Sequence, residues 1–196
     1  YHSLGVTLGT TLFNKVSLTG TFSGQADNLS KRQMFTTAGY VYAANASTRL
    51  GNHFNISASY NGYLQTQYDG TVKVNDSTRI NREMHSASLS QSNSYDTDTL
   101  GHTASMSLNY TSNKDLNPYA KGETDVQTMA FGLSYSMDAK PIETNFTLSF
   151  SHQDSKGFSS HYRSDVLSLG ASRSFLKEKN LNFSGTLSLC YNEIKR

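Results

Sequence analysis

Strict alternation of apolar and polar residues over residues 127–152 is the feature that most constrains the fold of this chain. One arm carries Met129, Phe131, Leu133, Tyr135 and Met137, separated by Ala, Gly or Ser; the other carries Ile142, Phe146, Leu148 and Phe150 among Glu, Asn, Thr and Ser. A period of two predicts a β-strand with two unlike faces. Each arm is roughly 10–11 residues, the length that a tilted strand needs to cross a bilayer. The turn between the arms is short, so the stretch predicts a β-hairpin.

The same alternation recurs from end to end, and no helix-period segment of useful length interrupts it. The strongest further example is residues 54–68, where Phe54, Ile56, Ala58, Tyr60, Leu64 and Tyr68 alternate mainly with Asn, Ser and Gln. We expect about ten strands in one domain spanning residues 1–196, near residues 3–12, 16–23, 38–46, 54–68, 84–91, 102–111, 127–137, 142–151, 167–175 and 181–191. The weakest of these is the strand at 84–91, which only Ala87 and Leu89 support.

The connections are expected to alternate in length. Short turns are predicted at Asn14, Gly51, Asp138 and Lys177, and long polar connections at residues 25–33, 69–83, 112–125 and 153–161, with 92–99 as an intermediate case. Outer-membrane barrels sort their connections in this way, with short turns on one side and longer loops on the other. The fold predicted is therefore all-β: a transmembrane antiparallel up-and-down β-barrel of about ten strands, either incomplete or part of a larger barrel.

Composition favours lipid as the solvent of the apolar face. Charged residues make up 16% of the chain, against about 25% in average soluble domains, and Ser, Thr, Asn and Tyr fill the gap. Four tyrosines near strand ends, Tyr68, Tyr110, Tyr135 and Tyr191, fit an interfacial girdle, and Arg173 near a short turn can extend its charge to the interface. The absence of Trp counts mildly against a girdle. A soluble, adhesin-like β-sandwich is the alternative.

Several classes of protein are excluded or disfavoured. Mean hydropathy is −0.53 and no apolar run approaches a membrane helix, which leaves barrel strands as the spanning element. The formal net charge of +2 gives no reason to expect nucleic acid. Cys190 is the only cysteine, so an internal disulfide is excluded. The chain begins with Tyr1 and shows no signal peptide, so we expect a processed product or a fragment.

No residue set predicts catalysis or a cofactor. The chain lacks a P-loop, GxSxG, HExxH or dinucleotide motif. None of the six histidines forms a close pair with metal-ligand spacing, and a hydrolase dyad of His102 with a nearby Ser is a weak signal because Ser is everywhere. We therefore predict no catalytic, cofactor-binding or metal-binding residues and no enzyme activity. The histidines concerned are His2, His53, His85, His102, His152 and His161.

Cys190 and the charged clusters are expected to have ordinary structural roles. Cys190 falls on the polar register, where it serves as a small residue. The clusters at Lys31/Arg32, Arg79/Arg82/Glu83, Lys121/Glu123/Asp125 and Arg163/Asp165 are interpreted as solvated loops of mixed sign. A pore mouth, a lipopolysaccharide-phosphate site or a docking site for a partner is the alternative for them.

The segments NFTLSFSH and HFNISASYNGYLQTQYDG resemble strands of outer-membrane β-barrels of Gram-negative bacteria, including those of the Bacteroidota. The resemblance covers nearly the whole chain but no family motif, so it implies the fold and the location and no functional residues. It implies an integral protein of the bacterial outer membrane.

Two functions are expected from this architecture. The first is a non-enzymatic structural or accessory component that binds partner proteins in an outer-membrane complex, with membrane lipid, for example lipopolysaccharide, as its surroundings. The second is a passive, weakly selective pore for small hydrophilic solutes. A ten-stranded barrel with Ser, Thr and Gly on its inner wall would be poorly filled by its own side chains. We therefore expect water, a plug or part of another chain inside it.

Overall fold

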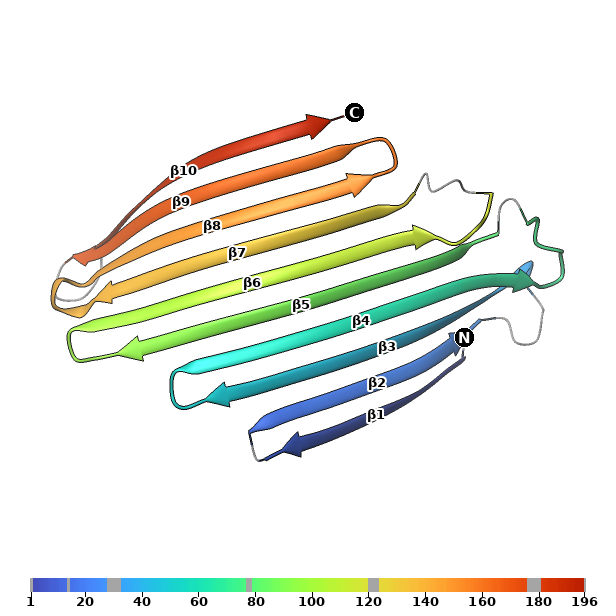
Figure 1. Cartoon of the computed structure of the whole chain (residues 1–196), viewed down its shortest axis with the longest axis horizontal. Helices are drawn as coiled ribbons and strands as arrows, with labels where there is room; N and C mark the ends of the chain where they lie inside the picture. Colours follow the sequence, from blue (N-terminus) through green and yellow to red (C-terminus); the bar gives the residue numbers. More distant parts are fainter. Residues whose placement is uncertain are drawn as a thin grey trace.

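A computed structural model describes residues 2–13, 15–27, 33–76, 79–119, 124–175 and 181–195, and these form one antiparallel sheet of ten strands in chain order. Figure 1 shows the sheet face-on, with β1 and β10 at opposite borders. The all-β, up-and-down prediction is confirmed, and the sheet is not closed into a barrel. The strands are β1 (His2–Leu12), β2 (Val16–Ala26), β3 (Phe35–Leu50), β4 (Phe54–Asp69), β5 (Asn81–Asp96), β6 (Leu100–Asp115), β7 (Val126–Ala139), β8 (Thr144–Gly157), β9 (His161–Phe175) and β10 (Leu181–Lys195), with a 3₁₀ turn η1 (Lys140–Ile142) between β7 and β8.

In all nine pairs of neighbouring strands, each residue pairs with one residue of the other strand, without a bulge. The register steps steadily in one direction, as Figure 1 shows. Following the pairs from Leu12, at the turn end of β1, leads to Leu189 on β10, eight residues beyond Leu181 at the turn end of that strand. Eight residues are about 26 Å and nine strand spacings about 43 Å, so the line of strand tips is inclined by about 30° to the pairing direction.

Among the connections that the structure describes in full, those at one end of the sheet are short, as predicted. Residues 51–53, 97–99 and 140–143 make these turns, and Gly51 has φ +63°, a left-handed conformation that glycine adopts without strain. The segment 92–99 thus consists of the end of β5 and a short turn. Asn14 and the predicted turn at residues 176–180 lie outside the described residues, as do Lys31, Arg32, Lys121 and Glu123.

At the other end, the predicted long connection at 153–161 is wrong. β8 continues to Gly157 and only residues 158–160 separate it from β9. The sequence misled because the outward side chains change from Phe150 to His152, Asp154 and Lys156 while the backbone pairing continues. The fifth strand is also longer than predicted, and the connections at 27–34, 70–80 and 116–125 remain the long ones.

Two of the long connections pack on each other. The side-chain amide Nδ2 of Asn117 donates to the backbone carbonyl oxygens of Asp76, at 3.1 Å, and of Arg79, at 2.9 Å. Asn117 itself is buried, and Val74 is one of the two buried hydrophobic residues among those described. The connection before β5 is therefore tied to the connection after β6.

Almost no hydrophobic core exists within this single-layered sheet. Among the described residues, Val74 and Ala139 alone are buried and hydrophobic, whereas Leu4 is 81% and Leu187 63% exposed. Contiguous apolar surface beyond a few hundred Å² marks a face that contacts a partner or a membrane. The fold therefore leaves its apolar side chains to be covered from outside the sheet.

Candidate functional site

The register separates the residues of the ten strands into two faces. On the apolar face, Tyr135, Leu148, Leu169 and Leu187 stand opposite one another across β7 to β10. The other face, here the hydroxyl face, carries rows of serine. One such row crosses six strands from β5 to β10 and consists of Ser92, Ser105, Ser134, Ser149, Ser168 and Ser188.

The hydroxyl groups of this second face bond to one another across the strands. Ser57 and Ser90 Oγ atoms lie 2.6 Å apart, and those of Ser105 and Ser134 lie 2.7 Å apart. Further pairs are Ser59–Ser88, Thr128–Ser155 and Ser168–Ser188. A hydroxyl both donates and accepts, so such pairs satisfy themselves without charge. The hydroxyl face is polar and carries no charge in the middle of the strands.

The charge-free zone of the sheet follows the same incline as the strand tips. Towards the short turns, Arg49 on β3 lies on the row that crosses β9 at Ser168, whereas Arg173 lies five residues nearer the turn. The shift of five residues is about 16 Å along the strands, and the six strand spacings from β3 to β9 are about 29 Å across them. The line that joins these two charges is therefore inclined by about 30° to the pairing direction, like the line of strand tips. Towards the loops, Glu193 is likewise closer than Glu83 to the row that joins Gln91 and Leu189. Arg49 lies on the hydroxyl face, whereas Arg173, Glu83 and Glu193 lie on the apolar face. The apolar residues therefore occupy a slanted, charge-free band of the sheet between two charged borders.

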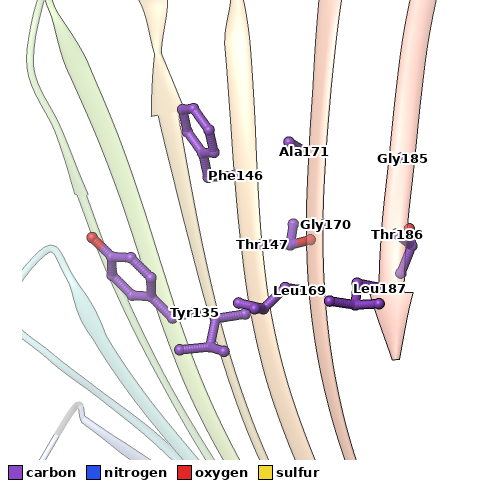
Figure 2. Close-up of a pocket in the computed structure, with 10 residues that line it drawn as sticks. Tyr135, Phe146, Thr147, Leu169, Gly170, Ala171, Gly185, Thr186 and Leu187 are labelled. Atoms are coloured by element: carbon purple, nitrogen blue, oxygen red, sulfur yellow. The ribbon is translucent and has the colours of Figure 1, made fainter. Parts of the chain in front are cut away.

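A shallow groove of about 640 Å³ lies in this band over β7 to β10. Figure 2 shows Phe146 on one side and Tyr135, Leu169 and Leu187 along the other. Small residues form its floor: Gly170, Ala171 and Gly185. Its lining is mostly apolar, so the groove fits an apolar chain or side chain better than a polar ligand.

Ion pairs gather on the apolar-face register at the loop-side border of β8 and β9. His152 Nδ1 lies 2.6 Å from Asp165 Oδ1, and His161 Nε2 lies 2.8 Å from Asp154 Oδ2. Arg163 Nε donates to the second oxygen of Asp165 at 3.1 Å. The hydrogen bond from His152, assisted by the Arg163 charge, holds the pKa of the Asp165 carboxyl below its usual value. The bond from His161 lowers the pKa of Asp154 in the same way.

Histidine and tyrosine pair at other points of the apolar face. Tyr60 Oη lies 2.8 Å from His85 Nδ1, with the two rings stacked, and His85 Nε2 lies 2.8 Å from Glu83. Tyr135 Oη lies 2.6 Å from His102 Nδ1. Each pair combines an apolar ring with a polar tip, which suits a boundary between an apolar and a polar solvent.

The hydroxyl face has one apolar depression of about 540 Å³ near the loop end. Its lining includes Val41, Tyr63, Met84 and Val126, which share a single row across β3 to β7 with Asn113. Tyr63 lies on the hydroxyl-face register of β4, between Asn61 and Gln65. The depression itself was missed because the row exists only once the register is known.

The structure places the sequence candidates as follows. His85, His102, His152 and His161 all lie on the apolar-face register and each has a Tyr, Glu or Asp partner. Cys190 lies on the hydroxyl-face register, as predicted, and is exposed. Arg79 pairs with Asp76 and Arg163 with Asp165, so both take part in mixed-sign clusters. The prediction of loops is wrong for Arg82/Glu83 and for Arg163/Asp165, which lie within β5 and β9, because backbone pairing continues where the side chains become charged. No cluster of three metal-ligating side chains occurs among the described residues.

Comparison with known proteins gives no family assignment. No protein-family model matches the chain, and no curated protein shows significant sequence similarity to it. In the part of the chain that the structure describes, no helix has the length and apolarity needed to cross a membrane.

Proposed function

We propose that the chain forms part of the wall of an integral outer-membrane β-barrel and acts there as a non-enzymatic structural component that binds partner proteins. The slanted apolar band is the observation that carries this proposal. A flat hydrocarbon slab crossing a sheet of tilted strands would be matched by an apolar band that is inclined to the pairing direction. Transmembrane strands tilt by about 35–45°, close to the incline of about 30° estimated from the register.

The width of the band also fits a membrane. Asp165 and Arg173 on β9 are eight residues apart, and Glu143 and Asp154 around β8 are eleven apart. At about 3.3 Å per residue and a 30° incline, these distances span roughly 23 Å and 31 Å across the band. The apolar band of an outer-membrane barrel is about 25 Å tall. The narrower limit is set by Arg173 and by Asp165, which pairs with His152 and Arg163.

A soluble β-sandwich explains the same features less well. Its strands average about 5–6 residues, whereas these run to 11–16. Its outer face meets bulk water and is usually rich in Lys and Glu, but here the second face carries paired hydroxyls. A sandwich would also need a second sheet over the whole apolar face.

The partner-binding role rests on the hydroxyl face. Its apolar depression at Tyr63 and Met84 offers a docking point for an apolar side chain of another protein. In the proposed barrel this depression would face the interior. A passive pore for small hydrophilic solutes is the second candidate, and the uncharged serine rows favour it because they offer hydrogen bonds without selecting a charge.

Membrane fractionation tests the first part of the proposal. We expect the protein to stay in the outer-membrane fraction after alkaline washing and to migrate differently in detergent gels before and after boiling. Recovery in the soluble fraction would overturn the proposal. Purification in mild detergent then separates the two roles: stoichiometric partners support the structural role, and stable ion-conducting openings in planar bilayers support the pore.

A further inference from the structure

Both edge strands of the sheet are free to pair. β1 pairs with β2 and β10 with β9, and no other strand pairs with either of them in the described part of the chain. The edges lie at opposite borders of the sheet in Figure 1. Their outward N–H and C=O groups extend over eleven residues of β1 and fifteen of β10.

Neither edge carries the features by which soluble proteins prevent strand addition. Such edges are usually blocked by Lys, Pro, a bulge or a short strand. β1 contains no Asp, Glu, Lys, Arg or Pro, and β10 has none before Glu193. The one-to-one pairing with β2 and β9 shows no bulge. Both edges therefore have the composition of strands in the interior of a sheet.

A membrane makes unpaired edges untenable. Hydrocarbon offers no hydrogen bonds, so every backbone group at that depth needs a partner in the protein. Given the proposed membrane location, on which this inference rests, each edge has to be covered along its length by another strand.

The two edges do not cover each other in the structure. β1 and β10 stand at opposite ends of the strand order and at opposite borders of the sheet in Figure 1, and β1 pairs only with β2 and β10 only with β9 in the described part of the chain. An open sheet of this kind fits one sector of a barrel with more strands than these.

We propose that each edge takes an additional antiparallel strand from outside the described sheet, so that the ten strands are one sector of a wider barrel wall. The added strand beside β1 places apolar residues opposite Leu4, Val6 and Leu8 and small polar residues opposite Gly5 and Thr7, because cross-strand neighbours share a face. It carries no charge over about eleven residues. The strand beside β10 follows the same pattern.

Cys190 makes the proposal testable. It is a free, exposed thiol on the hydroxyl-face register of β10, and Ser3 has the same register on β1. If β1 closed directly on β10 with the strand tips level, Ser3 would stand opposite Cys190. The experiment introduces Ser3→Cys in the full-length protein in its native membrane and applies oxidation or a short bismaleimide that tolerates a shift in register.

Val166→Cys is the matched positive control, since Val166 is the paired neighbour of Cys190 on β9. We expect Val166→Cys to cross-link with Cys190 and Ser3→Cys not to do so. An intramolecular link from position 3 to Cys190 would overturn the proposal in favour of closure. An intermolecular link would overturn it in favour of a second copy of this chain.

Amide exchange and photo-cross-linking supply the positive evidence. We expect the amides of β1 in the membrane to exchange within about tenfold of those of β5, as paired strands do. Exchange at the rate of an open edge overturns the proposal. A photoreactive residue at Thr7 should capture a peptide with alternating apolar and small polar residues from outside residues 2–195, and capture of β10 would contradict it. Failure of the membrane location would appear separately, in fractionation.

Discussion

An arginine placed at two adjacent positions of β8 tests the assignment of the two faces. Leu148 and Ser149 lie at the same depth, midway between Glu143 and Asp154, but on opposite faces. Leu148 is 42% exposed on the apolar face, where it lines the groove over β7 to β10. Ser149 is exposed on the hydroxyl face and stands between Ser134 and Ser168. The two substitutions therefore differ only in the solvent that receives the guanidinium.

The expected effects differ by orders of magnitude in the unfolding equilibrium. Arginine on the lipid face at mid-depth costs roughly 2–4 kcal/mol, and near the interface about 0–1 kcal/mol. Leu148→Arg should therefore lower the free energy of unfolding by roughly 2–4 kcal/mol, about 30- to 800-fold in the equilibrium constant. In the proposed barrel wall the side chain introduced by Ser149→Arg would face an aqueous lumen, so this substitution should cost below about 1 kcal/mol.

Reversible urea unfolding in lipid vesicles, followed by far-ultraviolet circular dichroism, measures these differences. Gln127→Arg serves as the depth control, because Gln127 lies on the apolar-face register near the loop end of β7. It should cost about as little as an interfacial arginine. Equal losses for Leu148→Arg and Ser149→Arg would refute the assignment of faces. A loss for Gln127→Arg as large as that for Leu148→Arg would refute the lipid as the solvent of the band.

Three further predictions concern stability. Because its histidine partner lowers the pKa of Asp165, the ionised carboxylate stabilises the fold at pH values above the usual carboxyl pKa near 4. The free energy of unfolding, measured from about pH 6 to pH 3, should therefore lose this contribution as pH falls. Asp165→Asn should remove this part of the pH dependence. Gly62→Ala places a Cβ about 2.1 Å from the far end of the Tyr42 ring, which has to move aside, and should destabilise by roughly 0.5–1.5 kcal/mol in urea unfolding, the cost of an off-rotamer ring; Gly20→Ala on the same face meets no atom within 4 Å and should be nearly neutral. Asn117→Ala removes both hydrogen bonds that join two loops and should make residues 70–80 cleavable by trypsin several-fold faster, with the rate in Asn117→Asp similarly raised.

The face of most residues could be predicted from the sequence, because a period of two assigns neighbours such as Leu148 and Ser149 to opposite sides without any knowledge of pairing. Strand ends were harder. At His152 and Asp154 the outward positions become polar while the strand continues, and only the partner strand shows that these residues pair with His161 and Asp165. Hydropathy along one strand therefore marked the end of the apolar band correctly and the end of the strand wrongly.

Features that depend on register could not be predicted at all. The serine row and the depression at Tyr63 and Met84 combine residues from strands that are far apart in the chain. A slip of one residue between two strands would exchange their faces, and a slip of two would keep the faces while moving every row. The alternation in the sequence excludes a slip of one residue but not a slip of two. The rows of residues across the sheet therefore become known only from the observed pairing.

The strongest argument for a membrane is that two independent inclinations agree. One comes from backbone pairing alone, in the shift between Leu12 and Leu181 across the sheet. The other comes from chemistry, in the shift between the charges of Glu83 and Glu193, which both lie on the apolar face. A sheet covered by another protein layer has no need for a straight charged border parallel to the line of strand tips. A planar slab of hydrocarbon requires both, since it cuts every tilted strand at the same depth and excludes charge along the whole cut.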